Sequence, residues 1–188
     1  MFVQTEATPN PNSLKFVINR MLYSDGSAEF TEELAEKHSP FAKHLYKIPY
    51  INNVFIAKNF VTVSKSDSNE WYELIPEIKL EIQNFFTTEQ EIISEELKQI
   101  LDKSKKDTIG SEGTVEERIE SALDKYIRPA VEMDGGAVYL HSFDKGTVKL
   151  KLRGACSGCP SSSITLKSGI EGVLKRFIPE VEEVMEVE

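Results

Sequence analysis

The sequence predicts an α+β protein made of two small domains that are joined by a helical or flexible linker. Two blocks of mixed strand-like and helix-like hydrophobic patterns support this fold class, and an aperiodic stretch at 102–113 separates them. The length of 188 residues also fits two small units, because single domains most often have about 100–150 residues. We expect domains at 1–87 and 114–188, with an acidic helix and linker at 88–113.

The first block begins with a strand, a short helix and a hairpin. Alternating apolar residues after a proline-broken loop predict a strand over 14–18. Ser39 and Pro40 supply an N-cap and a first-turn proline, which predicts a short helix after them. The β-rich runs 54–57 and 60–64 are two residues apart, as in a β-hairpin.

Two helical patterns complete the first block. One apolar face runs from Trp71 to Phe85, and Pro76 must start, kink or divide that helix because proline lacks an amide donor. A second helix is expected within 88–101, where apolar residues recur among acids. Periodicity then disappears over 102–113, so we interpret this stretch as a solvated connector.

The second block opens with a helix that carries a clear start signal. Thr114 and Glu117 have the spacing of a capping box, and the helix must end or kink near Pro129. The elements expected after it are a turn at 134–136, strands at 137–143 and 147–152, a helical face from 166 to 177 and a last strand at 181–187.

Charge and composition exclude several classes of function. The net charge is −9, with 12 basic and 18 acidic residues in 1–112 and 10 basic and 13 acidic residues in 113–188. Nucleic-acid binding is therefore not expected, because Lys and Arg contacts to phosphate supply most of its affinity. The sequence contains no apolar run of about 18 residues, which is the length that a membrane-spanning helix needs, so a membrane span is not expected. Residues 1–12 resemble neither a signal peptide nor a transit peptide, so we expect a cytoplasmic protein.

The two cysteines, Cys156 and Cys159, are the candidate functional residues. They are three positions apart, and a disulfide between them would close a loop too short to staple a fold. They lie in a turn between a predicted strand and a predicted helix, with Gly154 and Gly158 beside them. This spacing lets two thiolates face one metal, and the helix N-terminus favours negative charge.

Two cysteines do not complete a metal site. Zinc and 4Fe-4S sites usually take four protein ligands, and His38, His44 and His141 have no second ligand at metal spacing. A symmetric dimer supplies four thiolates from two chains and leaves the metal or cluster near an interface. No phosphate-binding loop or Ser/His/Asp arrangement is present in the sequence, so nothing requires an enzyme.

Segments around the cysteines resemble one known family. The segments are Ile127-Arg128-Pro129, Met133-Asp134-Gly135-Gly136, the run from Leu152 to Ser161, Lys167-Ser168-Gly169-Ile170-Glu171 and Ile178-Pro179-Glu180-Val181. Together they closely resemble the NifU C-terminal domain. The first half resembles the Nfu N-terminal domain through the run from Thr8 to Phe16, Ser39-Pro40 and the run from Val61 to Lys65. The resemblance covers nearly the whole chain except the linker region.

This resemblance implies a scaffold or carrier of iron-sulfur clusters. It implies that Cys156 and Cys159 bind a 4Fe-4S cluster that is shared by two chains of a homodimer. It also implies upstream cluster donors and apo iron-sulfur client proteins as partners. The N-terminal domain contains no cysteine, so the resemblance suggests a role in partner contact or modulation.

Two other functions fit the cysteine pair. In a thiol-disulfide oxidoreductase Cys156 would attack and Cys159 would resolve, but that motif is expected near the first strand of a βαβ unit. In a zinc-bridged structural dimer the same four thiolates would hold zinc. Iron and sulfide analysis after anaerobic purification distinguishes the three functions.

Overall fold

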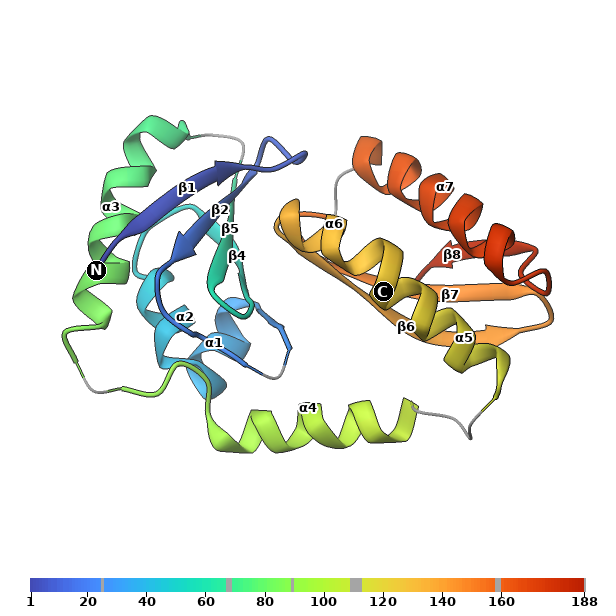
Figure 1. Ribbon diagram of the computed structural model, residues 1–188. Coiled ribbons are helices and arrows are strands. Elements are labelled where there is room, and N and C mark those ends of the chain that lie inside the picture. The colour runs from blue at the N-terminus through green and yellow to red at the C-terminus, as the bar shows by residue number, and fades with distance from the viewer. Residues whose placement is uncertain (25, 67–68, 89, 109–112, 158–159, 188) are drawn as a thin grey trace. The chain divides into compact units, whose positions relative to one another are not determined.

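The computed structural model describes residues 1–188 except 25, 67–68, 89, 109–112, 158–159 and 188, and it describes the side chains of these residues except those of 102–108 and 160–165 (Figure 1). The chain forms two compact units, Met1–Leu101 and Asp102–Glu188. Each unit contains both helices and strands. The predicted α+β class with two domains is therefore confirmed.

The first unit is a five-stranded antiparallel sheet that packs against helices. Its strands, in spatial order, are β1 (Val3–Ala7), β2 (Ser13–Ile18), β5 (Phe60–Lys65), β4 (Ile51–Ile56) and β3 (Ala28–Phe30). The helices are α1 (Glu32–His38), α2 (Pro40–Leu45) and α3 (Trp71–Phe85). Buried side chains of α2 and α3 share one hydrophobic core with the sheet.

Two local signals in this unit form as predicted. Strands β4 and β5 pair as a hairpin, and the Ala57 amide donates to the Phe60 carbonyl at 3.0 Å across its turn. The Ser39 hydroxyl accepts from the Ala42 amide at 3.0 Å and caps α2. The same hydroxyl donates to the Ile92 carbonyl at 2.6 Å, which ties α2 to the segment after α3.

Helix α3 continues through Pro76, so the proline neither starts nor divides it. Leu74, Ile78 and Ile82 are buried on the opposite side of the helix. Pro76 itself is exposed, so the carbonyl that loses its usual partner, that of Tyr72, is near solvent. Water can therefore replace the missing intrahelical hydrogen bond.

The helix expected within 88–101 extends further than predicted. Helix α4 runs from Glu95 to Thr108, so the segment 102–108 is helical, although we expected an aperiodic connector there. Of the helical or flexible linker that we expected, the segment 102–108 is helical, and residues 109–112 lie outside the described part of the chain. The limits of the linker stay a prediction. Ile93 is buried in the core of the first unit, and Leu97 and Leu101 pack against that core. These contacts join the start of α4 to the first unit.

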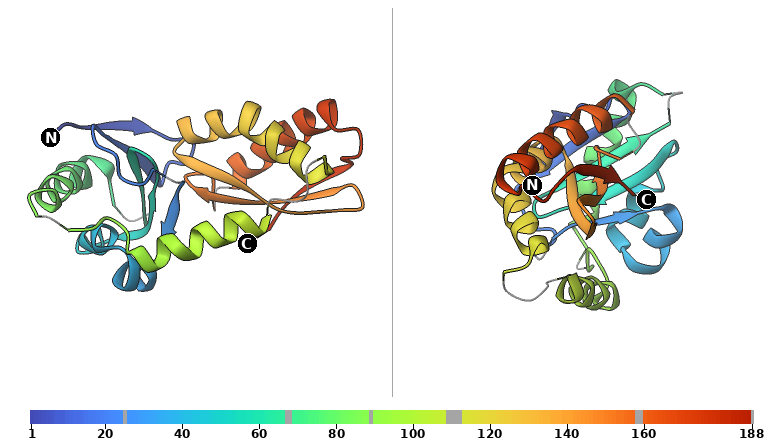
Figure 2. Two further views of the ribbon diagram at one scale, coloured as in Figure 1. Left: turned by 60° about the horizontal axis from the view of Figure 1, so that its bottom comes forward. Right: turned by 90° about the vertical axis from the view of Figure 1, so that its right-hand side faces the viewer.

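The second unit is a three-stranded sheet with helices on one face, as Figure 2 shows. Its elements are α5 (Val115–Ala122), the π-helical turn η1 (Leu123–Ile127), α6 (Arg128–Met133), β6 (Gly136–Asp144), β7 (Thr147–Gly154), α7 (Pro160–Phe177) and β8 (Glu183–Glu186). Strand β7 is central. It pairs antiparallel with β6 and parallel with β8. Helix α7 makes the crossover that parallel pairing requires.

The helical segment of this unit begins and bends where the sequence indicates. The Thr114 hydroxyl accepts from the Glu117 amide at 3.3 Å, and the Glu117 carboxylate accepts from the Gly113 amide at 2.5 Å. Glu117 thus reaches one residue further back than in a standard capping box. Near Pro129 the α-helix gives way to η1 and then to α6, because proline cannot donate the usual backbone hydrogen bond.

Arg128 fixes the bent segment to the sheet. Its Nε donates to the Val138 carbonyl at 3.1 Å, and its two terminal nitrogens bind Glu120, at 2.6 Å, and Asp124. Burial alone would lower the pKa of Arg128, but the hydrogen bond with Asp124 and the charge of Glu120 raise it overall. The guanidinium therefore stays charged and holds α6 beside the start of β6.

Within the part of the chain that the structure describes, no helix is both long and apolar enough to cross a membrane. The expected domain limits, 1–87 and 114–188, remain a prediction about independent folding. The core of the second unit supports that prediction, because it is assembled from residues between Val115 and Val184.

We predict that residues 114–188 fold without the rest of the chain. Their core includes Ile119, Val148 and Leu174, which are each 0% exposed, and its described members all lie between Val115 and Val184. Circular dichroism should show mixed helix and strand, and heating should give one cooperative transition. A fragment that melts without cooperativity while the full chain unfolds cooperatively would contradict this prediction.

Candidate metal site at the cysteine loop

The end of β7 positions Cys156. In the β6–β7 register Gly136 pairs with Gly154, the last residue of β7. Gly154 has φ +68, a left-handed conformation that glycine adopts at little cost. The chain turns there into Ala155, Cys156 and Ser157, the described part of the segment between β7 and α7 that we call the cysteine loop. The Ala155 amide then donates to the Gly135 carbonyl at 3.2 Å. The cysteine loop is thus hydrogen-bonded to the turn that precedes β6.

Gly136 is the residue that makes room for the thiol. A Cβ atom at this position would lie 2.6 Å from Cys156 Sγ and 2.7 Å from the Arg153 carbonyl oxygen. Real Cβ atoms do not approach other atoms so closely, so only glycine fits without displacement. Cys156 is 4% exposed and belongs to the core of the second unit.

The turn at 134–136 was predicted from the sequence, but the close approach of Gly136 to Cys156 was not. Met133 ends α6 and Gly135 has φ +81, so the predicted turn is present. The role of Gly136 depends on which residue of β7 it faces. That register is set by strand pairing between distant segments, and no local sequence signal encodes it.

Cys159 lies outside the described residues, together with Gly158. Helix α7 begins directly afterwards at Pro160. In the described part of the chain no three His, Cys, Asp or Glu side chains are grouped so that they could hold a metal ion. The assignment of Cys156 and Cys159 as ligands therefore stays a prediction, and the described residues add no third ligand to it.

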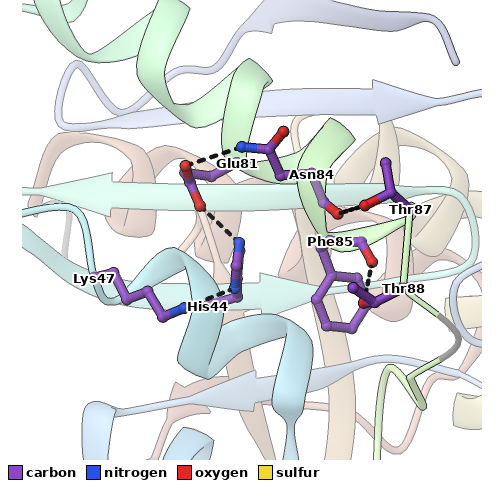
Figure 3. Close-up of polar contacts among 7 residues, drawn as sticks. All are labelled: His44, Lys47, Glu81, Asn84, Phe85, Thr87 and Thr88. Atoms are coloured by element: carbon purple, nitrogen blue, oxygen red, sulfur yellow. Dashed lines mark hydrogen bonds and ion pairs between the residues drawn. The ribbon is translucent and has the colours of Figure 1, made fainter.

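His44 has a structural setting in the first unit, which Figure 3 shows. Its Nε2 lies 2.6 Å from a carboxylate oxygen of Glu81 on α3, and its Nδ1 lies 3.1 Å from Lys47 Nζ. The two atoms lie within ion-pair distance, but their alignment does not meet the geometry of a hydrogen bond. Asn84 Nδ2 donates to the same carboxylate at 3.3 Å. These contacts link α2 to α3.

The other two histidines belong to different units. His38 is the last residue of α1, and its Nδ1 lies 3.4 Å from the Ser94 hydroxyl. His141 is exposed on β6, at an irregularity in the strand pairing. Among the described residues, no group of three potential metal ligands includes any of the three histidines.

Comparisons with known proteins cover both units. Residues 3–89 match the family described as scaffold protein Nfu/NifU N terminal, and residues 119–185 match the NifU-like domain family. The chain is 40% identical over 190 residues to the human mitochondrial NFU1 iron-sulfur cluster scaffold homolog, covering 100% of the chain and 72% of the human protein. It is 43% identical over 185 residues to the mitochondrial NifU-like protein 4 of Arabidopsis thaliana, covering 96% of the chain and 64% of that protein.

A third relative is the NifU-like protein C1709.19c of Schizosaccharomyces pombe, which is 37% identical over 191 residues. That alignment covers 100% of the chain and 73% of the relative. The chain thus spans less than two thirds of the Arabidopsis protein and somewhat more than two thirds of the human and yeast proteins.

The expected cytoplasmic location is wrong. The human and Arabidopsis relatives are mitochondrial by name, which points away from the cytoplasm. We based the expectation on the composition of residues 1–12. The lack of a targeting pattern in a short segment does not determine where a protein works, because targeting segments are commonly removed.

We predict that Gly136→Ala displaces the cysteine loop. The added Cβ overlaps Cys156 Sγ and a backbone carbonyl, so the substitution should lower the free energy of unfolding by about 1–3 kcal/mol. Maleimide should also modify Cys156 faster, as measured by mass mapping of the labelled peptide. Urea unfolding gives the stability.

Gly169→Ala is the matched control for this prediction. Gly169 lies within α7 and an added Cβ meets nothing within 4 Å, so this change should stabilise the protein by roughly 0.5–1 kcal/mol. If Gly136→Ala changed neither the stability nor the Cys156 labelling rate, or changed them only as Gly169→Ala does, the close packing at Gly136 would be contradicted.

Proposed function

The chain belongs to the family of Nfu and NifU-like iron-sulfur cluster scaffold proteins, and on that basis we propose that it binds a 4Fe-4S cluster and transfers it to apo-proteins. The family consists of scaffolds and carriers and is not a catalytic family. The cluster is therefore the cargo of this protein. The observation that carries the proposal is the placement of Cys156 in a glycine-bounded loop just before α7.

Cys156 and Cys159 are the proposed cluster ligands. They are the only cysteines in the chain, and a 4Fe-4S cluster usually takes four. Two chains together supply four thiolates, so the proposed loaded form is a homodimer with the cluster on its two-fold axis. The absence of a third ligand near Cys156 among the described residues fits this arrangement.

Cluster loading requires the Cys156 side chain to leave its buried position. The residue is 4% exposed, whereas a cluster shared by two chains must contact the surfaces of both. Only the thiolate binds metal, so loading also requires Cys156 to lose its proton. Gly154 lies at the start of the loop in a left-handed conformation. Because glycine changes its backbone conformation at little cost, we expect the loop to move about this residue.

The proposed partners are upstream cluster donors and apo iron-sulfur client proteins. A cluster held between two chains is released when those chains separate. The interface that completes the site therefore also limits the lifetime of the bound cluster. A buried single-chain site with four ligands would hold its cluster more permanently. The bridged arrangement therefore favours delivery over storage.

We predict that Cys156→Ser and Cys159→Ser each abolish stable cluster binding and leave the fold intact. Serine keeps the size of the side chain but is a poor ligand for iron. After anaerobic reconstitution the wild-type protein should be brown, and iron and sulfide per chain should fall nearly to zero in both variants. Ser157→Ala, in the same loop, is the control and should retain the cluster.

Wild-type iron and sulfide in either cysteine variant would overturn the site. A colourless protein that binds zinc in place of iron would support the zinc-bridged dimer. A reversible Cys156–Cys159 disulfide with no cluster would support the oxidoreductase. Transfer itself is tested by mixing the loaded protein with an apo-ferredoxin and following the spectrum of the acceptor, with free iron and sulfide as the comparison.

A further inference from the structure

Among the described elements between Thr114 and Val187, all helices lie on one face of the sheet, and we call the other face the helix-free face. Along β7 the residues Val148, Leu150 and Leu152 are buried beneath α5, α6 and α7, and Lys149, Lys151 and Arg153 alternate with them on the other face. Figure 2 shows that these helices lie on one side of the strands. The basic row, which we define as Lys149, Lys151 and Arg153, therefore runs along the centre of the helix-free face.

Apolar and aromatic side chains flank the basic row. Tyr139 of β6 is paired with Lys151, and Met185 of β8 is paired with Lys149. Directly paired residues point to the same side of a sheet, so both lie on the helix-free face. Met185 is 42% exposed although it is large and apolar. The face thus combines a cationic centre with apolar edges.

The two lysines of the row are not neutralised by the described part of the chain. Neither Lys149 nor Lys151 has a hydrogen bond or an ion pair there. Other lysines of this chain, such as Lys37 and Lys175, pair with a glutamate one helical turn away. In a protein of net charge −9, two neighbouring lysines without an ion pair among the described residues favour a negatively charged partner on this face.

We propose that the helix-free face binds an acidic amphipathic helix of a partner protein. Residues two apart on a strand are about 6.7 Å apart, and residues i and i+4 of a helix are about 6 Å apart along its axis. Carboxylates at i, i+4 and i+8 therefore match the spacing of the basic row. Apolar residues beside them would pack on Tyr139 and Met185, and the helix would cover the open face as a second layer.

A protein partner fits this face better than a nucleic acid. The row is short, and the chain as a whole is acidic, so a long polyphosphate would be repelled over most of the surface. The face also offers apolar contact, which a phosphate backbone does not use. A carboxylate-bearing helix uses both features.

The basic row ends beside the cysteine loop. Arg153 is three residues before Cys156, and its carbonyl oxygen is one of the atoms that Gly136 approaches. A helix docked along β7 would thus have one end next to the loop. The proposal does not depend on cluster binding, because the face is complete in the chain without a cluster.

The test uses full-length protein without cluster and a fluorescein-labelled, 16-residue helical peptide. The peptide carries glutamate at i, i+4 and i+8 and leucine beside each glutamate, and a scrambled peptide has the same composition. Fluorescence anisotropy gives the affinity. The double variant Lys149→Glu/Lys151→Glu should bind the peptide at least about tenfold more weakly than the wild type.

The matched control is Lys125→Glu/Arg176→Glu, which changes the net charge equally. Lys125 and Arg176 are exposed on the helical segments that cover the other face, so their reversal should change the affinity less than about twofold. Circular dichroism checks that each variant is folded. If the Lys149→Glu/Lys151→Glu variant does not fold, the milder Lys149→Gln/Lys151→Gln variant is used in its place. This variant should still weaken peptide binding several-fold.

Three results would overturn the proposal. They are no measurable binding of the peptide, equal binding of the scrambled peptide, and equal loss of affinity in the control variant. Tighter binding of a single-stranded DNA probe than of the peptide, with the same dependence on Lys149 and Lys151, would assign the face to nucleic acid instead.

Discussion

The cysteine loop depends on a close approach between two backbone segments that are far apart in the sequence. Gly136 begins β6, and Cys156 follows β7, yet the two residues are so close that not even a methyl group fits at Gly136. The left-handed turn at Gly135 ends α6 just before this contact, and the Arg128 guanidinium holds α6 to the Val138 carbonyl. A change in the helix, the strand register or the loop would therefore move the other two.

Strand β7 takes part in three features of the second unit: the hydrophobic core, the helix-free face and the cysteine loop. Its apolar residues form the centre of the core, its basic residues line the helix-free face, and its C-terminal end leads into the cysteine loop. This division follows from the two-residue repeat of a strand. The loop that is proposed to hold the cargo and the face that is proposed to bind a partner are thus positioned by one element.

Local signals explain which parts of the fold were predictable. The caps at Ser39 and Thr114 and the hairpin after Ala57 are encoded within a few residues, and they form as expected. Strands β1 and β3 and helix α1 were missed, because short elements of this kind are stabilised mainly by sheet pairing and packing. The extension of α4 to Thr108 was also missed, because its polar composition has no apolar face to reveal a helix. The same limit applies to the site: spacing identified the two cysteines, but the contact with Gly136 depends on tertiary register.

The central claim is that two chains share one cluster, and anaerobic sedimentation tests it most directly. Apo-protein and reconstituted protein are compared at matched concentration, with iron measured across each boundary. Because a cluster that binds only the dimer shifts the monomer-dimer equilibrium, we expect mainly monomer without cluster and mainly dimer with it. Iron should sediment with the dimer, at about four atoms per two chains. Four iron atoms on each chain of a clean monomer would contradict the bridged site.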